Sequence, residues 1–239
     1  MADSSISTST TDGTPSLRNV ALLRLLQLTS PALPVGAFNF SQGLECVVDA
    51  GDVSCERSAG DWIGGLARHA IGRLDIPILL RMHRAWSQGD SLIVQRWSER
   101  LIAARDTSEL RAEDRHMGSA LAKVLAELDI SDARAWINQP HSSFAALFAL
   151  AAQRWSIAQN DMASGYLWAW IENQVLGAVK LIPLGQSAGQ RLLDRLLREI
   201  PDIVGHAATL AADDIGVATP MQSLASMRHE TQYTRLFRS

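Results

Sequence analysis

Apolar residues recur at three- and four-residue spacings along most of this 239-residue chain, which is the period of an amphipathic helix. The pattern is clear after residue 56, where Trp62, Ile63, Leu66, Ile71 and Leu74 keep these spacings. Alternation of β-branched residues at every second position, which would indicate strands, is nearly absent. The hydrophobic pattern therefore predicts an all-α fold.

Proline, glycine and capping residues divide this pattern into about ten helices. Pro77 predicts a break or a kink, with the proline in a first helical turn. Asp90 and Thr219 are predicted N-caps, Pro183 opens a helix and Pro201 closes it. The predicted ranges are 18–29, 43–50, 56–87, 91–105, 108–128, 143–159, 162–181, 183–199, 202–213 and 220–230.

The N-terminus differs from the rest of the chain. Residues 1–17 are almost all Ser, Thr, Gly, Asp and Ala, which predicts a disordered arm before one compact helical domain over 18–239. The arm lacks the basic and apolar regions of a signal peptide, and longer apolar runs are interrupted before they reach membrane-spanning length. We therefore expect a soluble cytoplasmic protein that does not bind membranes.

Composition narrows the partner classes. Hydrophobic residues make up 47% of the chain and charged residues 20%, as in an ordinary globular protein. The formal net charge of -3 and the absence of basic clusters argue against a nucleic-acid partner. Cys46 and Cys55 are too few for a disulfide framework, and we interpret Cys46 as a packed thiol rather than a metal ligand.

The sequence contains no recognisable catalytic motif. Phosphate loops of the GxxxxGK[ST] or GxGxxG type are missing, and so is the GxSxG nucleophile motif. The charged run of Arg111, Glu113, Asp114 and Arg115 is predicted to be a solvated helix face. We therefore expect a protein that is not an enzyme.

The histidines do not predict a metal site either. All six are scattered, HExxH is absent, and none lies three or four residues from another His or Cys. A preformed site within one chain is therefore not expected. A site shared across a dimer axis, using one His or Cys from each chain, remains open.

Two segments do not resemble plain core. The first, residues 30–45, combines two prolines with Phe38 and Phe40, and is equally consistent with a docking loop and with a structural turn. The second, residues 226–239, combines Tyr233, Leu236 and Phe237 with three arginines. Aromatic residues and Arg are typical of interface anchors, so we favour partner binding over a tail that packs on its own domain.

These two segments and a third resemble the UreF family of urease accessory proteins. The matches are LLQLTSPALPVGAFNFSQGLE at 25–45, AVKLIPLGQSAGQRLL at 178–193 and SMRHETQYTRLFRS at 226–239, in the family's order and near its spacing. The resemblance extends over residues 18–239 and is weak between 85 and 140. Where the family often has Tyr, this chain has Phe38, which lacks the hydroxyl.

The resemblance implies a helical homodimer that binds UreD (also called UreH) and recruits the GTPase UreG, so that nickel is delivered to apo-urease. It also implies that the C-terminal tail becomes ordered on binding UreD. The candidate partner-binding residues are Phe38, Phe40, Ser41, Gln42 and Glu45 in the loop, and Arg228, His229, Glu230, Tyr233, Arg235 and Leu236 in the tail.

For nickel, the resemblance suggests a scaffold rather than a metal store, with no tightly bound cofactor. Some members have a Cys or His near the segment that here contains His206, which makes this residue a weak candidate ligand. The alternatives are a regulator of UreG that inserts Arg235 as an arginine finger, a nickel-binding metallochaperone, and a generic helical interaction scaffold.

Overall fold

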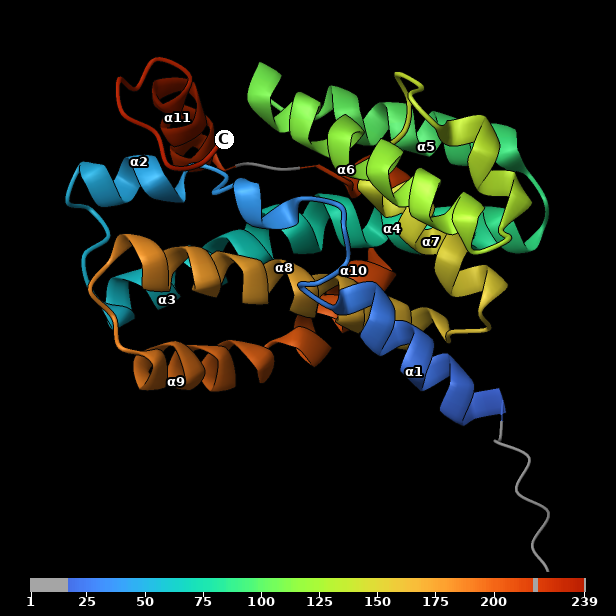
Figure 1. The fold of residues 1–239 in the computed structure, drawn as a ribbon, viewed down its shortest axis with the longest axis horizontal. Coiled ribbons are helices and arrows are strands. Elements are labelled where there is room, and N and C mark those ends of the chain that lie inside the picture. Colours follow the sequence, from blue (N-terminus) through green and yellow to red (C-terminus); the bar gives the residue numbers. More distant parts are fainter. Residues whose placement is uncertain (1–16, 217–218, 239) are drawn as a thin grey trace, which may run out of the picture.

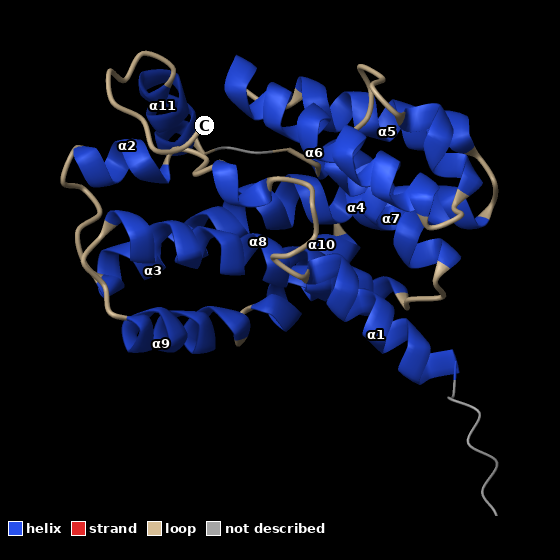
Figure 2. Cartoon of the chain, in the orientation of Figure 1, coloured by secondary structure: helices blue, strands red, loops and turns tan. Residues whose placement is uncertain are grey.

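The computed structural model describes residues 17–216 and 219–238, and every regular element in these ranges is helical (Figure 2). The all-α prediction is therefore confirmed. The predicted disordered arm lies outside the described residues, except for Leu17, which begins the first helix.

Eleven α-helices form the described part of the chain, in good agreement with the predicted ten (Figure 1). They are α1 (Leu17–Thr29), α2 (Leu44–Asp49), α3 (Glu56–Leu66), α4 (Ile76–Ser87), α5 (Ser91–Ala103), α6 (Ser108–Glu127), α7 (Phe144–Arg154), α8 (Gln159–Leu181), α9 (Gln186–Leu197), α10 (Ile200–Thr209) and α11 (Pro220–His229). Three short 3₁₀ segments, η1 (Ala37–Asn39), η3 (Ser131–Trp136) and η4 (Ala212–Asp214), lie between them.

Several helices begin at a capping side chain that the sequence makes visible. The carboxylate of Asp90 accepts a hydrogen bond from the Ile93 N–H, and the hydroxyls of Thr107 and Ser143 cap α6 and α7 in the same way. Each cap satisfies a backbone N–H that has no partner within its own helix. These local interactions explain why the predicted starts at 91, 108 and 143 are accurate within one residue.

Other predicted boundaries were wrong. The helix predicted to reach residue 159 ends at Arg154, because Ser156 has a φ of +55° and the Ile157 N–H turns back to the Ala152 carbonyl. Pro183 lies in the connection before α9, and Pro201 lies in the first turn of α10 rather than closing α9.

Helices α3 and α4 form one continuous helical run joined by a π-helical stretch, η2 (Ala67–Asp75). Pro77 follows in the first turn of α4, as predicted, and cannot donate to the Arg73 carbonyl four residues earlier. The N–H of Gly216 donates to this carbonyl instead, at 3.2 Å. The proline is tolerated because a segment far along the chain replaces the hydrogen bond that it removes.

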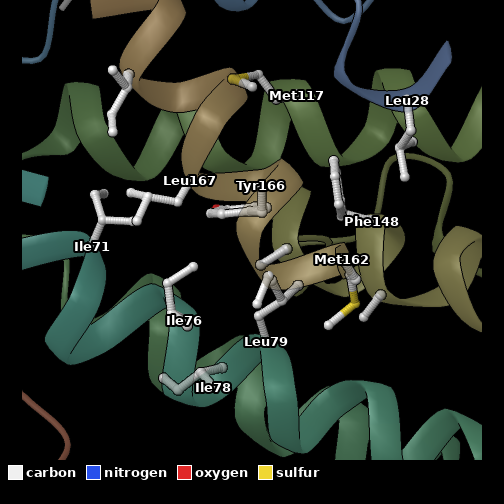
Figure 3. Packing of buried hydrophobic residues seen from close by; sticks show 14 of the residues in the cluster. Leu28, Ile71, Ile76, Ile78, Leu79, Met117, Phe148, Met162, Tyr166 and Leu167 are labelled. Atoms are coloured by element: carbon white, nitrogen blue, oxygen red, sulfur yellow. The ribbon is translucent and has the colours of Figure 1, made fainter. Parts of the chain in front are cut away.

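A single hydrophobic cluster runs through the helices, with α4, α7 and α8 near its centre (Figure 3). Residues 145–152 of α7 are fully buried, which explains why this stretch shows no polar face. Aromatic contacts link α7 to α8, where the ring centroids of Phe148 and Tyr166 are 5.2 Å apart. In the described part of the chain, no helix is long and apolar enough to span a membrane.

Helix α11 lies beside α2 at one corner of the molecule, where the C-terminus also lies (Figure 1). This corner brings the two interface-like segments of the sequence together.

Candidate partner-binding surface

The C-terminal tail, residues 230–238, folds back onto the loop that precedes α2. Glu45, in the first turn of α2, is the central contact: its Oε1 accepts from the Leu236 N–H at 2.6 Å and its Oε2 from the Phe237 N–H at 2.9 Å. A third backbone contact joins the Arg238 N–H to the Asn39 carbonyl at 2.8 Å. The tail is therefore held through its backbone by the first candidate segment.

Glu45 is positioned by the turn that begins α2. Gly43 has a φ of +89°, and a Cβ built there would lie 3.0 Å from the Cβ of Ala225 on α11. Glycine therefore permits both the left-handed backbone and the close approach of α11. The Ser41 hydroxyl accepts from the Glu45 N–H at 3.3 Å, which fixes the start of the helix.

His229 ends α11 and is completely buried between two carboxylates. Its Nε2 lies 3.1 Å from Oε2 of Glu45, and its Nδ1 lies 2.9 Å from Oε2 of Glu109 in the first turn of α6. Arg235 donates to the other oxygen of Glu109 at 2.6 Å. These contacts join α2, α6 and the tail through side chains that are far apart in sequence.

Glu230 forms a second connection between the tail and α6. Its Oε1 accepts from the backbone N–H of Ser108 at 3.0 Å and from the Ser108 hydroxyl at 2.7 Å. These hydrogen bonds lower the pKa of the Glu230 carboxyl below its ordinary value. A carboxylate at this position also interacts favourably with the positive end of the helix dipole.

Phe237 is the apolar anchor of the tail. Its ring is buried near Gly177 on α8, and the ammonium group of Lys180 lies 5.6 Å from the ring centroid. The contact combines apolar burial with a cation–π interaction.

The loop itself is held from behind by α6 and α8. Gln42 has a φ of +53°; its side chain donates to Glu113 at 2.7 Å and accepts from the Trp170 indole N–H at 2.8 Å. The Asn173 amide donates to the Ala37 carbonyl at 3.1 Å. The loop is therefore a fixed surface, as its prolines suggested.

The candidate residues divide into buried and exposed groups. Phe40, Ser41, Glu45 and His229 are buried, Gln42 and Glu230 are half-buried, and Phe38, Arg228, Tyr233, Arg235 and Leu236 are exposed. The tail does pack on its own domain, yet it leaves Tyr233 fully exposed and Leu236 65% exposed. Three further apolar side chains, Met221, Leu224 and Met227, are exposed at three-residue spacing on α11.

A pocket of about 130 Å³ adjoins the loop and is lined in part by Phe38, Gln42 and Leu176. Buried charges also contribute to its wall. Arg105 makes two hydrogen bonds to Asp75, at 2.6 and 3.1 Å, and a third to Asp114 at 2.9 Å. Burial raises the pKa of Asp75, and the positive charge of Arg105 opposes this effect.

Two residues of the predicted solvated helix face are in fact buried. Glu113 and Asp114 are 6% and 5% exposed, and Asp114 accepts from the Phe144 N–H as well as from Arg105. The prediction was wrong for this pair because the partners of Asp114 lie on other elements. Glu109 was not among the predicted site residues, although its place in the first turn of the helix predicted at 108–128 was visible.

Among the described residues, no group of three or more His, Cys, Asp and Glu side chains is arranged to hold a metal ion. His206, the weak candidate ligand, lies exposed near the end of α10. Cys46 is half-buried and Cys55 is exposed, and both are free thiols. At this corner, buried hydrogen-bonded groups such as Glu45 and His229 adjoin the exposed apolar side chains of Tyr233 and Leu236.

Comparison with known proteins gives the family of the chain. The UreF family model matches residues 53–197. The chain is 46% identical over 220 residues to the urease accessory protein UreF of Alkalilimnicola ehrlichii, covering 92% of this chain and 96% of that protein. It is 47% identical to the protein of the same name from Azoarcus sp., covering 91% and 95% of the two chains. The chain therefore belongs to the UreF family of urease accessory proteins.

Proposed function

We propose that this protein is a non-catalytic scaffold that binds UreD and recruits UreG to apo-urease, so that nickel reaches the urease active site. The observation that carries the proposal is the docking of the tail on the loop. The Arg238 N–H donates to the Asn39 carbonyl, so the loop and the tail meet at this point. Phe38 is one residue from this contact and Leu236 is two residues from it, and both side chains are exposed. Membership of an accessory family supports the same role.

Tyr233 and Leu236 are the side chains that best fit a direct contact with UreD. Large exposed apolar groups next to arginines are typical of interface anchors, because a partner can bury them at low entropic cost. Their burial in this chain is slight, so they contribute little to its own stability. The buried residues Glu45, His229 and Phe237 instead hold the tail in a defined position.

Binding of UreD to a Tyr233→Ser/Leu236→Ser variant tests this surface. We expect affinity to fall by more than about tenfold, since an interface anchor commonly contributes about 2 kcal/mol. Leu92→Ser is the matched control, because Leu92 is 67% exposed on α5. Equal affinity of the double variant and the control would remove the tail from the proposed interface.

Arg235 distinguishes the scaffold from the runner-up, a regulator of UreG. Its guanidinium is bound to Glu109, which supports an anchoring role over that of an arginine finger. We expect Arg235→Ala to weaken recruitment of UreG to the complex. If recruitment survives while stimulated GTP hydrolysis falls by about 10³-fold or more, the arginine-finger alternative is correct.

Nickel, in this scheme, is cargo of the assembled complex, with no resident ion in this chain. Scattered histidines support this part of the proposal, because tight nickel sites need several converging ligands. Equilibrium dialysis of the isolated protein tests it. Stoichiometric binding at micromolar nickel would instead favour a metallochaperone.

The proposal further includes a homodimer that acts in the cytoplasm without nucleic-acid or membrane partners. The family resemblance implies the dimer, and the formal net charge of -3 is unfavourable for binding nucleic acid. Sedimentation equilibrium with full-length protein tests the dimer. A monomer at concentrations well above those used for complex assembly would contradict it.

A further inference from the structure

The contacts of His229 indicate how many protons its imidazole ring carries when the tail is docked. Both ring nitrogens lie within hydrogen-bond distance of a carboxylate oxygen, Glu45 on one side and Glu109 on the other. The ring is fully buried, so water does not replace either contact. Two nitrogen-to-carboxylate hydrogen bonds require two N–H groups, whereas a neutral imidazole has one.

The second proton is expected on the ring rather than on either glutamate, because imidazole is a stronger base than a carboxylate. Glu45 already accepts the backbone N–H groups of Leu236 and Phe237, one on each oxygen. Glu109 accepts the guanidinium of Arg235. Both side chains therefore act as acceptors, and an imidazolium at His229 supplies an N–H to each of them. With Arg235, the two positive charges balance the two carboxylates.

Other charged and titratable groups surround this cluster. They are Cys46 on α2, Arg228 on α11, Glu230 just after it and Lys180 on α8. Burial raises the pKa of the Cys46 thiol, so the thiol stays neutral near pH 7. Hydrogen bonds from Ser108 lower the pKa of Glu230, so this group stays a carboxylate. Among these groups, His229 is the one whose two contacts depend on its proton.

We propose that the docked C-terminal tail is held by an imidazolium at His229 and is released when this proton is lost. Docking then takes up a proton whenever the released imidazole is neutral. The docked form is favoured at lower pH, and docking weakens as the pH rises. Loss of the proton leaves one carboxylate oxygen facing a nitrogen lone pair, and these two acceptors repel each other. The hydrogen bond between His229 and that glutamate is then lost, and the tail is released.

Docking of the tail on its own chain can be tested without a partner. Full-length protein with ¹⁵N-labelled histidine reports directly on the ring, with His229 assigned by its absence in His229→Gln. We expect both nitrogens of His229 to be protonated at neutral pH. A neutral ring at pH 6.5 in protein whose tail is docked would overturn the proposal.

Tail docking is measured in the same samples by hydrogen exchange at the Leu236 and Phe237 amides, corrected for intrinsic exchange rates. We expect protection to fall as the pH rises, by up to about tenfold per pH unit, the limit for one linked proton. Protection that stays constant from pH 6 to pH 9 in the wild-type protein would contradict the proposed role of His229.

Glu109→Gln provides a second variant, because its amide can donate to a neutral ring. We expect docking to persist in this variant with little dependence on pH; an unchanged pH dependence contradicts the proposal. None of these measurements involves UreD or UreG. Failure of the His229 proposal can therefore be distinguished from failure of the proposed partner-binding surface.

Discussion

The carboxylate of Glu230 caps the first turn of α6 by accepting hydrogen bonds from the N–H and hydroxyl of Ser108, 122 residues earlier in the chain. The end of the chain thus stabilises a helix that begins near its middle. The same helix provides Glu109 for the His229 contact. Tail docking and the stability of α6 are therefore coupled.

This coupling predicts that Glu230→Ala lowers the free energy of unfolding by about 1 kcal/mol, as loss of a helix cap commonly does. Urea denaturation measures the change. The pKa of Glu230 is lowered in the folded protein, so its contribution is present above the ordinary pKa and is lost as the pH falls through the folded pKa. The difference between wild type and variant is therefore expected to shrink below about pH 4. A constant difference would contradict the assignment.

The buried ion cluster predicts a larger effect. Arg105→Met leaves Asp75 and Asp114 buried without their cation, which we expect to cost about 3–5 kcal/mol. Arg198→Met is the control, because Arg198 forms an exposed pair with Asp194 and is expected to contribute less than about 1 kcal/mol. Chemical denaturation compares the two. Similar losses of unfolding free energy in the two variants would show that the buried cluster stabilises the protein no more than the exposed ion pair does.

Two helical glycines predict opposite effects of a single methyl group. A Cβ at Gly118 would collide with the Ser142 carbonyl oxygen and lie 2.7 Å from the Ser143 carbonyl carbon, so Gly118→Ala is expected to cost about 1–3 kcal/mol or more. Gly65 lies in α3 with nothing within 4 Å of its Cβ position. Gly65→Ala is expected to stabilise the protein by about 0.5–1 kcal/mol. Thermal unfolding measures both changes in stability. Changes of the same sign in the two variants would contradict the packing of α6 on the 142–143 segment.

The anchor role of Phe237 predicts a local effect. Phe237→Ala is expected to release the tail and remove the exchange protection of the Leu236 amide, because the apolar contact near Gly177 is lost. Tyr233→Ala is the control, since this ring is fully exposed and is expected to leave protection unchanged. Retained protection in Phe237→Ala would show that the hydrogen bonds to Glu45 alone hold the tail.

Much of the helical pattern was predictable because it depends on local interactions. A residue such as Asp90 or Thr107 caps the helix that directly follows it, and apolar spacing reflects the helix itself. The family resemblance was also visible in the sequence, because it depends on residue order. The loop and the tail could be selected as unusual segments, but their contact with each other could not.

By itself, the sequence determined the all-α class, most helix starts and the two candidate segments. Tertiary structure decided which polar residues are buried: Asp114 faces Arg105, and Glu45 receives the tail 191 residues later. It also decided which candidates are exposed, leaving Tyr233 in solvent and His229 in the interior. The physical reason is that burial of a charged group is favourable only where distant segments provide its hydrogen-bond partners, and no local pattern records their positions.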